Sequence, residues 1–145
     1  MITFHEKDLQ KLGFTFDPES NSLQYYSDLI LEGNIETNTN LKFDCNFRCN
    51  GFIRAKEISV QGTIIVDGSL SCDNIEAETI IVYGDLLYVP KRIVCSSSLV
   101  SHGKITTSRI YASSLTSYNS VDALEISAKK LSLHNGISCN SLTTK

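Results

Sequence analysis

The chain has 145 residues, of which 41% are hydrophobic and 20% are charged. This length and composition predict one folded domain with its own core and exclude an intrinsically disordered chain. A net charge of −3 gives no basic footprint for nucleic acid or an anionic membrane, and no apolar run approaches the roughly 18 residues of a membrane-spanning helix.

Residues 1–20 differ in pattern from everything that follows, and we expect them to form a capping segment. The stretch TFHEKDLQKLG has the capping-box spacing between Thr3 and Glu6 and a stop at Gly13, which predicts one short helix. This helix and the following FTFD are expected to fold over the first layer of the domain behind them. The segment lacks the basic and apolar regions of a secretory signal.

Residues 21–145 carry an internal repeat. The stretches ISVQGTIIVDGSL and IEAETIIVYGDLL repeat one motif, and three apolar columns recur every 16 to 19 residues. The first column is Leu41, Ile58, Ile75, Ile93, Ile110, Ile126 and Leu142; the second is Ile30, Phe47, Ile64, Ile80, Leu99, Leu115 and Leu131; the third is Ile35, Ile53, Leu70, Leu86, Ile105, Val121 and Ile137. A fixed period of this length is typical of a solenoid.

Within a repeat, apolar and polar residues alternate, as in Ile58-Ser59-Val60, which is the period of a strand with one buried face. A corner residue follows the second of three short strands, and we expect it to be left-handed. These corners are Gly33, Gly51, Gly68, Gly84, Gly103, Asn119 and Asn135-Gly136. The pattern predicts an all-β fold, a single-stranded parallel β-helix with three faces and roughly seven coils over residues 21–145.

The five cysteines have irregular spacing and form no C-x-x-C pair, so neither a disulfide framework nor a zinc site is expected. Cys49, Cys72, Cys95 and Cys139 fall on inward phases of the alternation, as small core residues do. Free buried thiols indicate a reducing, cytoplasmic location.

One repeat is longer than the others. Leu86 to Arg92, LLYVPKR, carries two or three extra residues with Tyr88, Pro90, Lys91 and Arg92 at or near its tip. Such an insertion maps to a loop on one side of a solenoid and serves a partner or is neutral. Neither proline interrupts a predicted strand.

The residues before the corners form a further column, which includes Tyr83, His102, Tyr118 and His134. Stacked coils place these rings above one another, which predicts a surface ladder or a shallow contact strip for a protein or a sugar. His102 and His134 lie two coils apart, about 10 Å, which is too far to share a zinc ion.

The repeat continues to SLTTK with no second capping segment, so the last coil is expected to be open. We predict a self-association surface there, formed by Val121, Ile137, Cys139 and Leu142. The alternative is that this coil frays, or that the charge of Lys145 disfavours pairing of its edge with a second copy.

No catalytic constellation is recognisable. The acidic residues are scattered over the corners, and the abundant serines lack fixed His and Asp partners. No Gly-rich phosphate loop precedes a helix. The sequence therefore predicts a protein without enzymatic activity, metal or cofactor.

The stretches SDLILEGNIETN, GFIRAKEISVQGTIIVDGSL and IEAETIIVYGDL resemble the coils of bactofilins, which are bacterial cytoskeletal proteins. The resemblance covers residues 27–88 well and the rest only as a general repeat. It implies a right-handed β-helix that polymerises end to end without nucleotide, often at the inner face of the membrane. A folded N-terminal cap blocks one of the two contacts that a filament needs, which favours dimers.

The first hypothesis is therefore a structural protein that self-associates through its last coil into dimers or filaments. The alternative is a small protein-binding module or inhibitor, of the kind that viruses and mobile elements encode, which blocks its partner with a lateral face.

Overall fold

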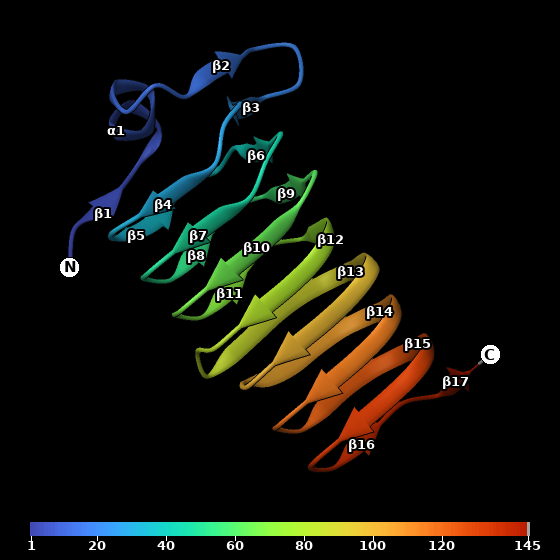
Figure 1. The fold of residues 1–145 in the computed structure, drawn as a ribbon. Helices are drawn as coiled ribbons and strands as arrows, with labels where there is room; N and C mark the ends of the chain where they lie inside the picture. Colours follow the sequence, from blue (N-terminus) through green and yellow to red (C-terminus); the bar gives the residue numbers. More distant parts are fainter. Residues whose placement is uncertain (145) are drawn as a thin grey trace.

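The computed structural model describes residues 1–144 and shows an all-β solenoid of about seven stacked coils behind an N-terminal cap (Figure 1). Each coil has three faces, and the strands of successive coils pair in parallel with their equivalents. The predicted parallel β-helix is therefore confirmed.

Separate short strands form the first three coils. Face A is built by β3 (Ser22–Tyr25), β6 (Asn40–Phe43) and β9 (Glu57–Val60). Face B is built by β4 (Leu29–Leu31), β7 (Phe47–Cys49) and β10 (Thr63–Val66). Face C is built by β5 (Asn34–Glu36), β8 (Ile53–Arg54) and β11 (Leu70–Ser71).

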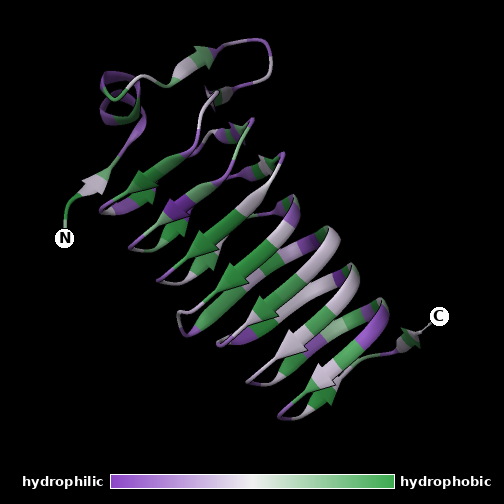
Figure 2. Cartoon of the chain, viewed as in Figure 1, coloured by the Kyte–Doolittle hydropathy of each residue, from purple (hydrophilic) through white to green (hydrophobic). Residues whose placement is uncertain are grey.

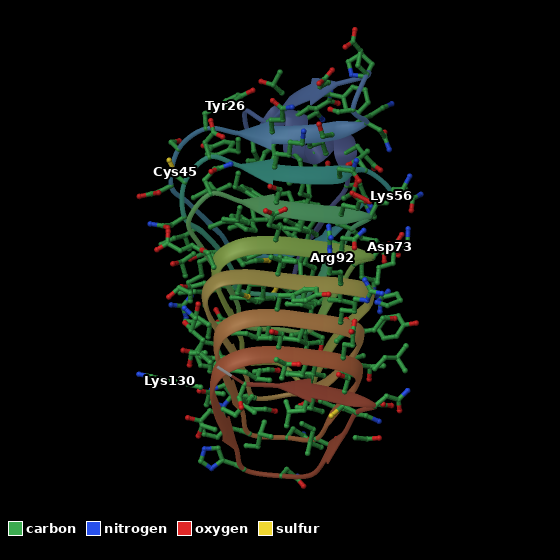
Figure 3. All side chains as sticks on the ribbon, turned by 90° about the vertical axis from the view of Figure 1, so that its right-hand side faces the viewer. Tyr26, Cys45, Lys56, Asp73, Arg92 and Lys130 are labelled. Atoms are coloured by element: carbon green, nitrogen blue, oxygen red, sulfur yellow. The ribbon has the colours of Figure 1, made fainter. Side chains whose placement is uncertain are left out.

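The later strands are longer than the short strands that the sequence predicts. They are β12 (Asn74–Val82), β13 (Leu86–Ser101), β14 (Lys104–Ser117) and β15 (Val121–Leu133), followed by the short β16 (Ile137–Ser138) and β17 (Ser141–Thr143). Each long strand bends around one or two corners, and its ladder pairing resumes on the next face. Figure 3 views face A, with Lys56, Asp73 and Arg92 along one edge and Tyr26 and Cys45 along the other.

The predicted apolar columns line the interior, with two corrections. In the second column Leu29, not Ile30, pairs with Phe47, and Ile30 points outward with 69% of its surface exposed. In the third column Leu87, not Leu86, lies between Leu70 and Ile105. Both errors arose where two adjacent aliphatic residues offered the same spacing, so the column alone did not say which one faces inward.

Most corner glycines are required because two backbones pack closely there, and not because the backbone is left-handed. Among the corners within residues 1–144, only Gly33 has a left-handed φ, +153°. At Gly68, an added Cβ would stand 2.6 Å from the carbonyl carbon of Gly51. At Gly51, Gly68, Gly84 and Gly103 the backbone lies so close to the corner of the preceding coil that a side chain has no room.

Pro90 was expected in a loop but lies within β13. The ladder shifts register between Val89 and Arg92 and again between Cys95 and Ser98. The first shift contains Pro90, which therefore does not need to donate a ladder hydrogen bond. The extra length of this coil is thus divided between two bulges and does not form one swollen loop.

The cap closes the solenoid at coil 1. Its helix α1 (Glu6–Lys11) begins after His5, whose backbone N–H donates to Asp8 Oδ2 at 2.9 Å. The predicted Thr3–Glu6 box is therefore wrong, because Thr3 belongs to β1 (Thr3–Phe4). Strand β1 pairs in parallel with β5, and β2 (Thr15–Asp17) pairs antiparallel with β3.

The cap also fills the interior at that end. Leu9 is fully buried and Phe14 nearly so, and the Phe14 ring packs at 4.9 Å from Tyr25 and 5.7 Å from Phe43. Within the described chain, no helix has the length and apolar character needed to cross a bilayer.

Candidate interaction surfaces

The last described coil, coil 7 (residues 130–143), differs from the coils below it in burial. Its three strands are Lys130–Leu133 on face B, β16 on face C and β17 on face A, and each pairs with the equivalent strand of the preceding turn. Within residues 1–144 none of the three has a partner on its outer side. Ile137 is 38% exposed and Leu142 47% exposed, whereas Val121 and Ile126 beneath them are about 1% exposed.

The predicted self-association residues belong to two successive coils. Ile137, Cys139 and Leu142 belong to coil 7, where Cys139 is half-buried against the core. Val121 lies one coil below and pairs with Ile137, so it supports the end surface from within.

The predicted ring ladder is present at the corner between faces B and C. Ring centroids are 4.9 Å apart for Tyr83 and His102, 4.5 Å for His102 and Tyr118, and 4.6 Å for Tyr118 and His134. Tyr83 and Tyr118 are 48% and 46% exposed, so the ladder presents ring edges to solvent. Offset stacking of this kind stabilises each neighbouring pair.

The other predicted partner-binding residues do not join the ladder. Tyr88 points outward on face C beside Thr106, whereas Arg92 lies on face A beside Asn74. Pro90 and Lys91 lie at the corner between these faces. The set therefore covers three sides of the solenoid and does not form one surface.

The sequence interpretation missed an apolar stripe on face B. Ile65, Ile81 and Val100 point outward in three successive coils and stand in register. Figure 2 shows hydrophobic residues along β10 and β12, and more polar ones toward the ends of β14 and β15. The signal was the doubled isoleucine of T-I-I-V, since only one member of each pair can face inward.

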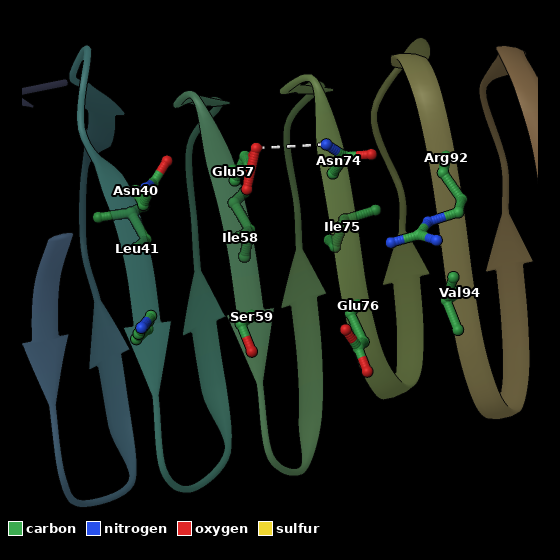
Figure 4. Close-up of a pocket in the computed structure, with 11 residues that line it drawn as sticks. Asn40, Leu41, Glu57, Ile58, Ser59, Asn74, Ile75, Glu76, Arg92 and Val94 are labelled. Atoms are coloured by element: carbon green, nitrogen blue, oxygen red, sulfur yellow. Dashed lines mark hydrogen bonds between the residues drawn. The ribbon is translucent and has the colours of Figure 1, made fainter. Parts of the chain in front are cut away.

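Face A carries a polar column beside its apolar one (Figure 4). Asn74 Nδ2 donates to Glu57 Oε2 at 3.3 Å, and the Arg92 side chain extends over the same strip toward Ile75. A groove of about 140 Å³ runs over Asn40, Glu57, Asn74 and Arg92. Two carboxylates line this groove, Glu57 and Glu76, and Glu57 accepts the hydrogen bond from Asn74.

The core thiols are held in the neutral form. Burial raises the pKa of Cys95 to about 12. Burial, with a smaller contribution from Asp67, raises the pKa of Cys49 to about 11, and a hydrogen bond from the Gly51 backbone N–H opposes this shift. Nucleophilic chemistry requires the thiolate, so these positions are structural.

No protein-family model, no curated protein and no solved structure matches this chain. Within the described residues, no cluster of three or more His, Cys, Asp or Glu side chains has the arrangement of a metal site.

Proposed function

We propose that the protein is a non-enzymatic structural element that self-associates through coil 7 of two copies, in the manner that the resemblance to bactofilins implies. The observation that carries the proposal is the contrast between the two ends of the described solenoid. The first coil is covered by α1, β1 and β2, whereas coil 7 exposes Ile137 and Leu142 above a closed core.

Backbone hydrogen bonding and burial of apolar side chains both favour a contact between coil 7 of two copies. Strands with an unpaired edge form backbone hydrogen bonds with a second edge that meets them. Burying a side chain such as Ile137 contributes about 1.5–3 kcal/mol relative to full exposure. A two-fold axis perpendicular to the solenoid joins the same coil of both copies and leaves each cap at an outer end, so the assembly stops at two copies along this direction.

Electron microscopy and light scattering of the purified protein test this proposal. We expect rods with twice the length of one solenoid, and Ile137→Asp is expected to return them to single length. Val94→Asp, which also places a carboxylate on an outward aliphatic position but in the middle of face A, is the matched control. Rods of single length in the unmodified protein would contradict the proposal.

A second candidate function is favoured by the ring ladder. Tyr83, His102 and Tyr118 form an exposed row of stacked rings with little side-chain freedom, which is the composition of a protein-binding surface. Capture of one cellular partner at one-to-one stoichiometry, and its loss in Tyr83→Ala and Tyr118→Ala, would support this function.

A further inference from the structure

The outward column of face B runs in register through all seven coils. It consists of Ile30, Arg48, Ile65, Ile81, Val100, Thr116 and Ser132. The three central members form the apolar stripe. Side chains that are apolar in successive coils of a flat sheet form a contiguous patch, and such a patch marks a contact surface.

The two ends of face B carry opposite charge. In coil 1, Asp28 precedes Leu29 and Glu32 follows Leu31. In coil 7, Lys130 occupies the position equivalent to Asp28 and supplies the positive charge, and His134 occupies the position equivalent to Glu32. All four of these side chains are exposed.

The charges nearer the middle of face B are already satisfied. Arg48 donates to Asp67 at 3.0 and 3.3 Å, and this pair lies next to Ile65. Between it and Lys130, the outward column has only Ile81, Val100 and Thr116 beyond Ile65, so the central part of the face is uncharged.

This arrangement is self-complementary for one orientation. A two-fold axis along the strand direction at coil 4 places Ile81 against Ile81 of a second copy, and Ile65 against Val100 of the second copy. It also places the acidic coil 1 against the basic coil 7. A parallel arrangement would place acid against acid and base against base, which is unfavourable.

We propose that face B is a lateral interface between two antiparallel copies of this chain. The ladder hydrogen bonds of face B are already made within each copy, so the contact is a sheet-on-sheet packing of side chains, with about 10 Å between the sheets. This interface is independent of the end contact through coil 7. An end contact lengthens the assembly, whereas the lateral contact widens it.

The first test isolates the lateral contact. In the Ile137→Asp background, which removes the end contact, we expect a molecular mass by light scattering of twice the 16.1 kDa of one chain. Adding Ile81→Lys is expected to give monomers, and adding Val94→Lys, the same change at an outward aliphatic position of face A, leaves the dimer intact. A monomer in the Ile137→Asp background, or an equal effect of both lysines, overturns the proposal.

The second test determines whether the two copies of the dimer are antiparallel. Asp28→Lys and Lys130→Glu each replace two attractions of the dimer with two repulsions, and each is expected to weaken it about tenfold or more. The double variant Asp28→Lys, Lys130→Glu restores the attractions and is expected to regain most of the affinity. The two residues lie in coils 1 and 7 of one chain, so a folding defect cannot produce this recovery. Failure of the double variant to recover overturns the antiparallel arrangement, and binding of an unrelated protein to face B in place of a second copy overturns the proposal.

Discussion

The backbone of Gly103 lies directly against that of Gly84 in the preceding coil, and a Cβ added to Gly103 would stand 2.2 Å from the Gly84 carbonyl oxygen. The same Cβ would also be 2.3 Å from the carbonyl carbon of Asp85. Both contacts are with backbone, which cannot rotate away as a side chain can.

Gly103→Ala is therefore expected to lower the free energy of unfolding by about 3 kcal/mol, the upper part of the range for overpacked sites. Gly136 offers the matched control, because no atom lies within 4 Å of its added Cβ. Gly136→Ala is expected to change the free energy of unfolding by less than about 0.5 kcal/mol. Chemical denaturation of both variants checks the prediction, and equal effects would contradict the close packing of the corners.

The thiols are expected to differ in reactivity. Cys49, Cys72 and Cys95 are buried, whereas Cys45 and Cys139 are partly exposed. A thiol reagent at neutral pH should modify two cysteines quickly and the remaining three only upon unfolding, because burial removes both access and thiolate. Mass spectrometry after brief alkylation counts the modified sites, and rapid labelling of Cys95 would contradict the structure.

Stability is expected to fall in alkaline solution. The pKa values of Cys49 and Cys95 are raised from about 9 to about 11 and about 12 in the folded protein. The folded state therefore keeps protons that the unfolded chain loses above pH 9, so this contribution is complete below pH 9 and is lost as the pH rises toward 11 and 12.

Each such thiol lowers the free energy of unfolding by up to about 1.4 kcal/mol per pH unit within that interval. Denaturation midpoints measured on both sides of pH 9 give the slope. Cys95→Ala should have a shallower slope than the unmodified protein, and an unchanged slope would exclude Cys95 as a source.

The columns of the solenoid were predictable because a coil length that is nearly constant brings equivalent residues together. Ile58, Ile75 and Ile93 pair as the spacing indicated. The inward choice between Leu86 and Leu87 was not predictable, since it depends on the exact number of residues in the preceding corner. The bulges beside Pro90 depend on pairing to both neighbouring coils, which no single repeat reveals.

The surface features also differ in how far the spacing of residues predicts them. The ring ladder was predictable from the spacing of Tyr83, His102 and Tyr118, because stacking follows once the coils are aligned. The stripe of face B was missed, although one isoleucine of each T-I-I-V pair must face outward. Ile65 and Ile81 are adjacent to the core residues Ile64 and Ile80, and the alignment of these outward residues with Val100 follows only from the register between coils.

The ladder is expected to contribute to stability. Tyr118 stacks on His102 and on His134, so Tyr118→Ala removes two ring contacts, while His134→Ala removes one. At about 0.5–1.5 kcal/mol for each aromatic pair, the first change should cost about twice as much as the second. Thermal denaturation of both variants measures the ratio, and equal costs would argue against a stacked ladder in solution.

The cap determines how far assembly can proceed. Leu9 is fully buried on α1 and belongs to the core cluster, so Leu9→Asp places a carboxylate among apolar side chains. The helix, together with the flanking strands β1 and β2, is expected to detach from coil 1. Since the coils of a solenoid are stabilised mainly by their neighbours, the remaining coils should stay folded. Both ends of the solenoid then present unpaired strands and apolar side chains, and we expect assemblies longer than two copies.

Leu12 supplies the control for this experiment, because it lies at the end of the same helix and is 44% exposed. Leu12→Asp should leave the length of the rods unchanged. Electron microscopy gives rod lengths, and circular dichroism reports whether the strands of the Leu9→Asp variant persist. Rods of unchanged length in a variant whose helix has detached would show that coil 1 cannot make an end contact, and the limit on assembly would then lie in coil 1 itself and not in its cap.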